Sequence, residues 1–249
     1  MTQDFALAGE LLKAVGTAVS GALLAYYSST LKLREQGAEF SKQLGQLRER
    51  MRLERDEARQ QATETAQQQY LNPLRFAVYE LLDRLHMVEE KIAIPDDYQS
   101  MQRWFQGIEQ RTRDKPAFDR WCNDEGYFAM VTLYITATYF EYACKLLPES
   151  PFRALDQAYD DVLVQLVRRV RDAFSGIDFI WRESQDDVAH IVSRDGKVIS
   201  YMEFRELVTV KYPWFLRMVR AYGDIRREHV SRVSAALSEL RAFLEGRAS

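Results

Sequence analysis

The stretch NPLRFAVYELLDRLHMVEEKIA, residues 72–93, decides the fold class of this chain. Asn72 is a residue type that accepts hydrogen bonds from free amides at a helix start, and Pro73 suits the first helical position because it has no amide hydrogen. Pro95 predicts the end of the same helix. Apolar side chains recur at spacings of three and four, so we expect one face to be buried. The residues of that face are Leu74, Val78, Leu81, Leu85, Val88 and Ile92.

Amphipathic patterns of the same kind continue along the chain and predict an all-α fold with a C-terminal multi-helix bundle over residues 70–249. Only 11 Gly and 6 Pro among 249 residues argue against a turn-rich all-β fold. Predicted helices cover residues 98–113, 127–147, 151–174, 184–191, 201–211, 213–222 and 224–244, with a turn at 194–196.

Several side chains have expected places in these helices. Ser184 with Asp187 three residues later resembles a capping box. The expected buried face of the helix over residues 151–174 includes Val162, Leu166, Val170 and Phe174. Acidic residues flank the basic residues of that helix, so we expect a solvated face there, and we expect three tryptophans to anchor helix contacts. These residues are Arg168, Arg169 and Arg171, and Trp121, Trp181 and Trp214.

The run over residues 127–147 is uncharged from Tyr127 to Phe140, so a second membrane span is the alternative to a buried helix. Its Tyr and Thr content, and the pair formed by Glu141 and Lys145 at a spacing of four, favour the buried helix.

Charge and cysteine content exclude some classes of function. The 34 Lys and Arg against 37 Asp and Glu give a net charge of -3, so no global field attracts nucleic acid, and we expect no nucleic-acid partner. Cys122 and Cys144 are too few for a disulfide framework or a four-thiolate zinc site. A reducing compartment fits this composition best.

Residues 1–30 predict a hydrophobic N-terminal helix. From Leu11 the run reaches 17 residues with only Lys13 charged, at the lower edge of the roughly 17 to 25 residues that a spanning helix needs. Asp4 and Glu10 argue against a secretory signal peptide, so we expect an uncleaved membrane anchor. Whether this helix spans the membrane, lies on it or avoids it stays open.

Basic residues after the apolar run orient the expected anchor. Lys32, Arg34 and Lys42 follow it, so the positive-inside rule predicts a single-pass membrane protein with its C-terminal domain in the cytoplasm. Small residues at every fourth position, Ala14, Ala18 and Ala22, favour close approach of two such helices.

Residues 31–69 predict a charged helical stalk or a short coiled coil. Leu33, Phe40 and Leu47 repeat every seven residues, and Leu44 and Met51 do likewise, as d and a positions of a heptad seam. We therefore expect a homo-oligomer. Polar residues occupy the seam after Met51, so a single polar stalk, or a charged helix packed on its own domain, also fits.

From Tyr70 to Leu85 the start of the bundle reads Y-x-x-P-L-x-x-A-x-Y-x-L-x-x-R-L. This motif resembles the opening of the helical domain in a group of uncharacterised bacterial proteins, and the aromatic region Thr138-Tyr139-Phe140 is similar to theirs as well. The resemblance covers residues 70–245. It implies a bacterial origin, and hence the inner membrane for the expected anchor, together with a hydrophobic N-terminal helix and a charged helical stretch; it implies no activity.

No P-loop, nucleotide-binding glycine motif, nucleophile elbow, zinc-protease motif or CxxC pair occurs in the sequence. We predict no catalytic, cofactor-binding or metal-ligating residues and no cofactor. The sharpest metal hypothesis combines the two DxxH pairs with Glu141, against the interpretation of surface pairs. The pairs are Asp83 with His86 and Asp187 with His190.

The sequence favours a non-enzymatic, membrane-anchored helical scaffold, sensor or effector that acts through protein interactions. One alternative is an enzyme or ligand-binding protein with a pocket near Tyr134, Tyr139 and Phe140, with His86 or Glu141 in the chemistry. Another is a pore-forming effector built on the polar stripe of the N-terminal helix.

Overall fold

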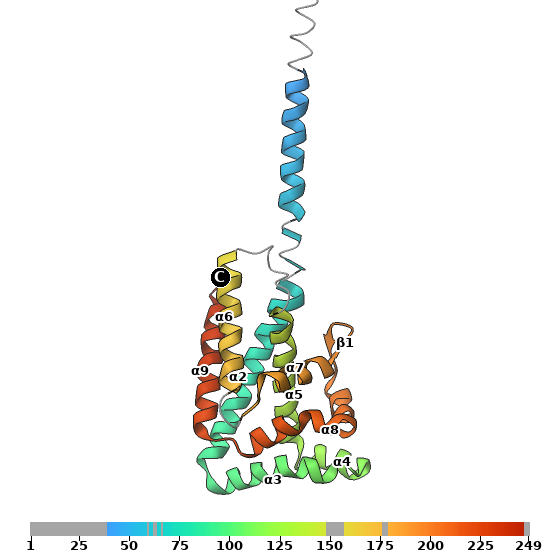
Figure 1. Cartoon of the computed structure of the whole chain (residues 1–249), viewed down its shortest axis with the longest axis vertical. Helices are drawn as coiled ribbons and strands as arrows, with labels where there is room; N and C mark the ends of the chain where they lie inside the picture. Colours follow the sequence, from blue (N-terminus) through green and yellow to red (C-terminus); the bar gives the residue numbers. More distant parts are fainter. Residues whose placement is uncertain are drawn as a thin grey trace, which may run out of the picture. The chain divides into compact units, whose positions relative to one another are not determined.

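A computed structural model describes residues 39–58, 60–61, 64–65, 67–147, 157–175 and 179–246. In the segment that begins at residue 157, side chains are described from residue 161 onward. The chain forms two compact units, Met1–Gln60 and Gln61–Ser249. The described residues of each unit are mainly helical, which confirms the all-α prediction (Figure 1). The predicted hydrophobic helix over residues 1–30 lies outside the described residues.

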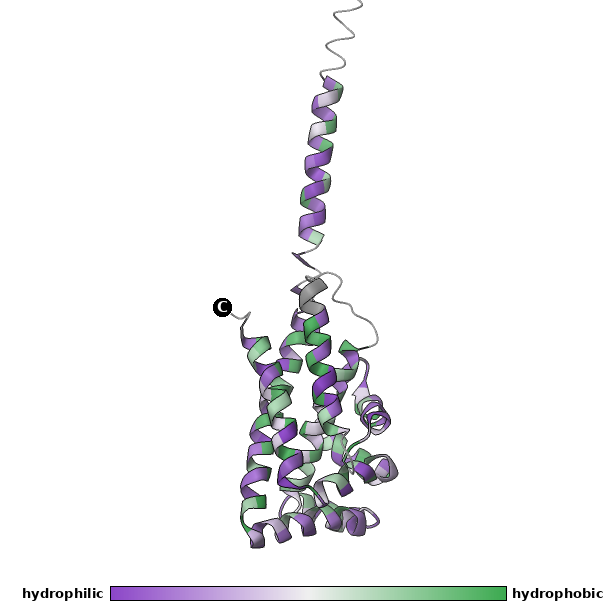
Figure 2. Cartoon of the chain, turned by 60° about the vertical axis from the view of Figure 1, so that its left-hand side comes forward, coloured by the Kyte–Doolittle hydropathy of each residue, from purple (hydrophilic) through white to green (hydrophobic). Residues whose placement is uncertain are grey.

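The first unit contains one continuous helix over residues 39–58, and all its described side chains are exposed. Hydrophilic residues cover most of its surface, with hydrophobic ones between them (Figure 2). The predicted charged helix is therefore confirmed over this range. Pairing with a second helix, which the coiled-coil prediction requires, stays a prediction.

The second unit, called the helical body below, begins with the π-helix η1, Gln67–Leu71, and continues directly into α2, Asn72–Ala93. The predicted cap at Asn72 is wrong. Leu71, which precedes α2, has a helical conformation, and no side chain caps the start of α2. A cap is not needed there, because the carbonyls of η1 can accept hydrogen bonds from the first amides of α2. Ile94 is extended before Pro95, so the predicted end of α2 is confirmed.

The remaining helices follow the predicted order, with one addition. The short α4 was not expected, although Asp114 caps it by accepting a hydrogen bond from the amide of Ala117 at 3.2 Å. The helices are α3 Pro95–Arg111, α4 Lys115–Cys122, α5 Tyr127–Leu146, α6 Gln157–Phe174, α7 Arg182–Ile191, α8 Tyr201–Gly223 and α9 Arg227–Glu245. An antiparallel pair of strands, β1 Ser193–Arg194 and β2 Lys197–Val198, spans the predicted turn.

Two helix starts correct the sequence analysis. The capping box expected at Ser184 does not open α7, which begins earlier, after Trp181. Instead Ser200 opens α8 with a full capping box, because its hydroxyl accepts from the amide of Glu203 while the Glu203 carboxylate accepts from the amide of Ser200. The break predicted before Pro213 is confirmed as a kink at Lys211 (φ -115°, ψ 25°) inside α8.

Helices α2, α5, α6 and α9 run side by side, while α3, α4 and α8 lie across one end of the body, away from η1 (Figure 1). The apolar stripe of α2 is buried as predicted, except that Ile92 is half-buried. The regular stripe of α9 is buried as well, with residues Val230, Val233, Leu237, Leu240 and Leu244. On α6, Val170 and Phe174 are buried as predicted and Leu166 is half-buried, whereas Val162 is exposed. Leu163 and Val167 are buried instead of Val162, because the helices packed on α6 decide its rotation.

Aromatic rings fill the centre of the body. Phe140 meets Phe174 edge to face at 5.0 Å between ring centroids, and Phe105 stacks on Tyr222 at 5.4 Å. Full burial of a side chain of this size contributes about 1.5 to 3 kcal/mol. In the part of the chain that the structure describes, no helix has the length and apolar character to cross a membrane, and the α5 run is a buried core helix.

Candidate functional site

The residues expected to line an enzyme pocket are core residues. Tyr139 and Phe140 are fully buried and pack against Phe174. Tyr134 donates a hydrogen bond from its hydroxyl to the carbonyl of Ile199 at 3.0 Å. Burial raises the pKa of Tyr139 well above its ordinary value. These side chains therefore join α5 to its neighbours.

The acid and base candidates also have structural partners. Glu141 is 5% exposed and lies 2.5 Å from the ammonium of Lys145, which donates to the carbonyl of Gly196 at 2.6 Å as well. His86 is exposed and lies 3.4 Å from Glu90. Among the described residues no group of three or more His, Cys, Asp or Glu side chains can hold a metal ion, so the structure does not bring the two DxxH pairs together with Glu141.

Both thiols lie in environments that suppress ionisation. Burial raises the pKa of Cys122 to about 11 and that of Cys144 to about 12. The thiol of Cys144 donates to the Asp186 carboxylate at 3.1 Å. Both thiols are therefore protonated near neutral pH and have the character of structural residues.

A buried polar network at the end of α6 contradicts the expected solvated face. Arg171 is 8% exposed and donates to Gln185 at 3.0 Å and to Asp186 at 2.6 Å. The amide of Gln185 donates in return to the carbonyls of Arg171 and Ile180. This network joins α6 to α7, while Arg169 on the same helix keeps the expected solvated position.

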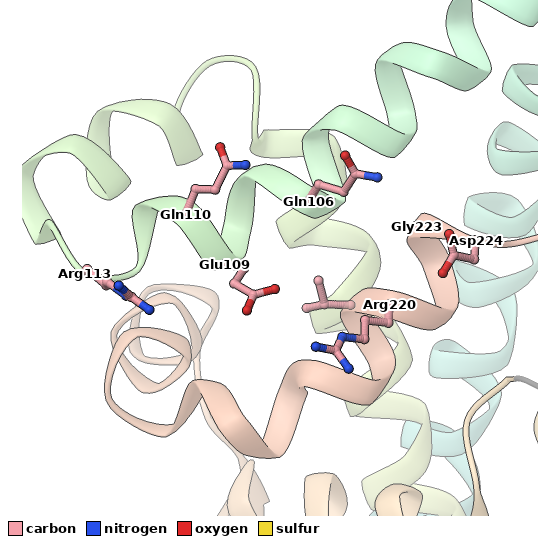
Figure 3. Close-up of a pocket in the computed structure, with 8 residues that line it drawn as sticks. Gln106, Glu109, Gln110, Arg113, Arg220, Gly223 and Asp224 are labelled. Atoms are coloured by element: carbon pink, nitrogen blue, oxygen red, sulfur yellow. The ribbon is translucent and has the colours of Figure 1, made fainter.

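The cleft of Figure 3 lies between α3 and the end of α8, with a volume of about 720 Å³. The side chains of Glu109 from α3 and Arg220 from α8 point toward one another across it, and no ion pair joins them. Next to the cleft, burial raises the pKa of Tyr212 to about 12; the Glu109 carboxylate adds to the rise and Arg220 opposes it. The other lining residues are Gln106, Gln110, Arg113, Val219, Gly223 and Asp224.

The groups that line this cleft can bind a polar molecule. They are guanidinium, carboxylate and amide side chains, which offer hydrogen bonds and charges to a polar ligand or to a polar segment of a partner.

Two of the three tryptophans are only about half-buried. Trp121 is buried as expected. Trp181 is 51% exposed and Trp214 is 47% exposed. The guanidinium of Arg217 lies 3.9 Å from the centroid of the Trp181 ring. Sequence reasoning missed this surface, because nothing local to either tryptophan tells whether a helix covers it.

No family model, no curated protein and no solved structure matches this chain.

Proposed function

We propose that this protein is a self-associating helical interaction module, held at a membrane by residues 1–30 and acting as a scaffold, sensor or effector without an enzymatic reaction. One observation carries the proposal. The helix over residues 39–58 presents an apolar heptad stripe to solvent, whereas the helical body keeps its apolar stripes inside.

The stripe, called the seam below, consists of Phe40, Leu44, Leu47 and Met51. Their exposed fractions are 63%, 39%, 54% and 44%, in the order of the chain. Spacings of four, three and four place these side chains along one line of the helix, where a second copy of the same helix can cover all four. Burial of each side chain contributes up to about 1.5 to 3 kcal/mol, which offsets the cost of association when several act together.

Two kinds of substitution test the seam: a negative charge introduced within it, and the same charge introduced on the same helix outside it. We expect Leu44→Glu and Leu47→Glu to convert an oligomer into a monomer in light scattering coupled to size-exclusion chromatography. Leu53→Glu is the matched control, because Leu53 is 57% exposed on the same helix but lies outside the seam. A wild-type protein that is monomeric at every concentration contradicts self-association.

The sequence of residues 1–30 supports the membrane anchor. The predicted location is the bacterial inner membrane, with the helical body in the cytoplasm. Membrane fractionation with a carbonate wash tests it. We expect the full-length chain to stay with the membrane and a variant without residues 1–30 to be released. Release of the full-length chain by the wash contradicts a spanning anchor.

The cleft between α3 and α8 supports a second candidate function, the binding of a polar ligand. Opposite charges on Glu109 and Arg220 face each other without an ion pair, so a molecule that carries both charges fits between them. Titration of the protein with free amino acids, followed by NMR, tests this function. Shifts at the cleft that disappear in Arg220→Met support it, and an unchanged spectrum excludes it for these ligands.

A further inference from the structure

The second half of α8 carries a surface that the proposed function does not yet use. Trp214, Arg217 and Arg220 follow at spacings of three, so they lie next to one another around the helix. Trp181 joins them from the start of α7, because Arg217 packs on its ring at 3.9 Å. We call these four residues the α8 patch.

The apolar part of the patch is large for a surface that remains in water. Both indole rings are about half exposed, and Val210, one turn before Trp214 at the kink of α8, is 75% exposed. Tryptophan and arginine are enriched among the residues that contribute most of the binding energy in protein interfaces, and here both types lie exposed side by side. The kink at Lys211 contributes to this exposure, because it interrupts the regular course of α8 between Val210 and Trp214.

The cations of the patch have no acidic partner within the described residues. Ion pairs there hold arginines such as Arg169, Arg182 and Arg194, but none includes Arg217 or Arg220. The guanidinium of Arg217 lies over an aromatic ring instead, and Arg217 is exposed, so its N–H groups can donate to a carboxylate. A ligand that complements the patch therefore carries an anionic group next to an apolar group.

The acidic neighbours of the patch select a protein as the occupant. Glu109 and Asp224 beside Arg220 repel a continuous run of phosphates, whereas a polypeptide can alternate acidic residues with others.

We propose that the α8 patch binds a segment of a partner protein in which one large apolar side chain adjoins carboxylates. The apolar side chain packs between the rings of Trp181 and Trp214, and the carboxylates bind Arg217 and Arg220. The inference rests on the proposed function in one respect, that the protein acts by binding other proteins. It depends neither on the seam nor on the membrane anchor.

The test selects peptides from a random displayed library on the full-length chain in detergent micelles. We expect enriched sequences to carry Asp or Glu next to Phe, Leu, Ile or Trp, and one such peptide, fluorescently labelled, to bind with an affinity that falls as salt rises. Arg217→Glu and Trp214→Ala should each weaken binding by about tenfold or more. Trp181→Phe, which keeps a ring under Arg217, should weaken it less than Trp181→Ala.

Matched controls separate the patch from general effects. Arg168→Glu changes the same charge at an exposed site on α6, and Val162→Ala removes an exposed apolar side chain there; both should leave binding unchanged. Circular dichroism verifies the fold of each variant. The seam variants should keep peptide binding, so loss of self-association alone leaves this inference intact.

Three outcomes overturn the proposal. The first is that the selected peptides do not combine acidic with large apolar residues. The second is that the selected peptide binds wild type and Arg217→Glu with equal affinity. The third uses vesicles of phosphatidylglycerol: if the variant without residues 1–30 binds them through Trp214 and Arg217 while no peptide binds, the occupant is a lipid surface.

Discussion

The ring of Trp121 lies directly against the backbone of Gly126, so closely that a Cβ atom at position 126 would lie 2.4 Å from two of its ring carbons. Gly126 accepts this contact in an ordinary helical conformation, at φ -80° and ψ -8°. The glycine is therefore required by the close approach of the ring and not by its backbone angles.

Gly126→Ala should destabilise the protein by about 1 to 3 kcal/mol, because the Trp121 ring must move out of a packed site. Urea unfolding followed by Trp fluorescence measures this. Gly45→Ala is the control: nothing lies within 4 Å of the new methyl group, and alanine favours the helix by up to about 1 kcal/mol. Equal stability of Gly126→Ala and wild type would show that the Trp121 ring does not occupy this position.

Arg171→Ala should lower the free energy of unfolding by about 1 to 3 kcal/mol, since it leaves the buried side-chain oxygen of Gln185 without its donor and removes the ion pair with Asp186. Arg169→Ala, two residues earlier, breaks an exposed pair with Glu239 and should cost about 0 to 1 kcal/mol. Thermal unfolding compares the two variants. Similar losses for both would contradict the burial of the network.

Ser200→Ala should cost about 1 kcal/mol, because the first turn of α8 loses the hydroxyl that accepts from the amide of Glu203. Ser184→Ala should leave stability nearly unchanged, since the cap predicted there is absent. Denaturant titration of both variants under the same conditions decides between them. A larger loss at Ser184 would restore the sequence-based placement of the cap.

Stability should fall as the pH rises from about 9 to 11. Burial raises the pKa of Cys122 from 9.0 to about 11, so between these values the thiol ionises in the unfolded chain while it stays protonated in the folded one. The unfolded state then binds fewer protons and gains population. Urea unfolding at pH 8 and pH 10 measures the effect, and Cys122→Ala should reduce the difference. Rapid alkylation of Cys122 in the folded protein at pH 8 contradicts the shift.

Sequence periodicity by itself determined the helices and most of their buried faces. Leu74, Val78 and Leu81 on α2, and Leu237 and Leu240 on α9, are fully buried where their spacing predicts. The break before Pro213 followed from the chemistry of one residue. Such features depend on interactions within a few turns of the chain, which the order of residues contains.

Only the tertiary structure decided which polar and aromatic side chains water reaches. Arg171 is buried because Gln185 of another helix accepts from it, and Trp181 stays half exposed because its one described ring contact is Arg217. Glu109 and Arg220 face each other although they lie 111 residues apart along the chain. Contacts between distant segments have no local signature, so the burial of single polar and aromatic side chains, the cleft and the exposed patch are decided only when the chain folds.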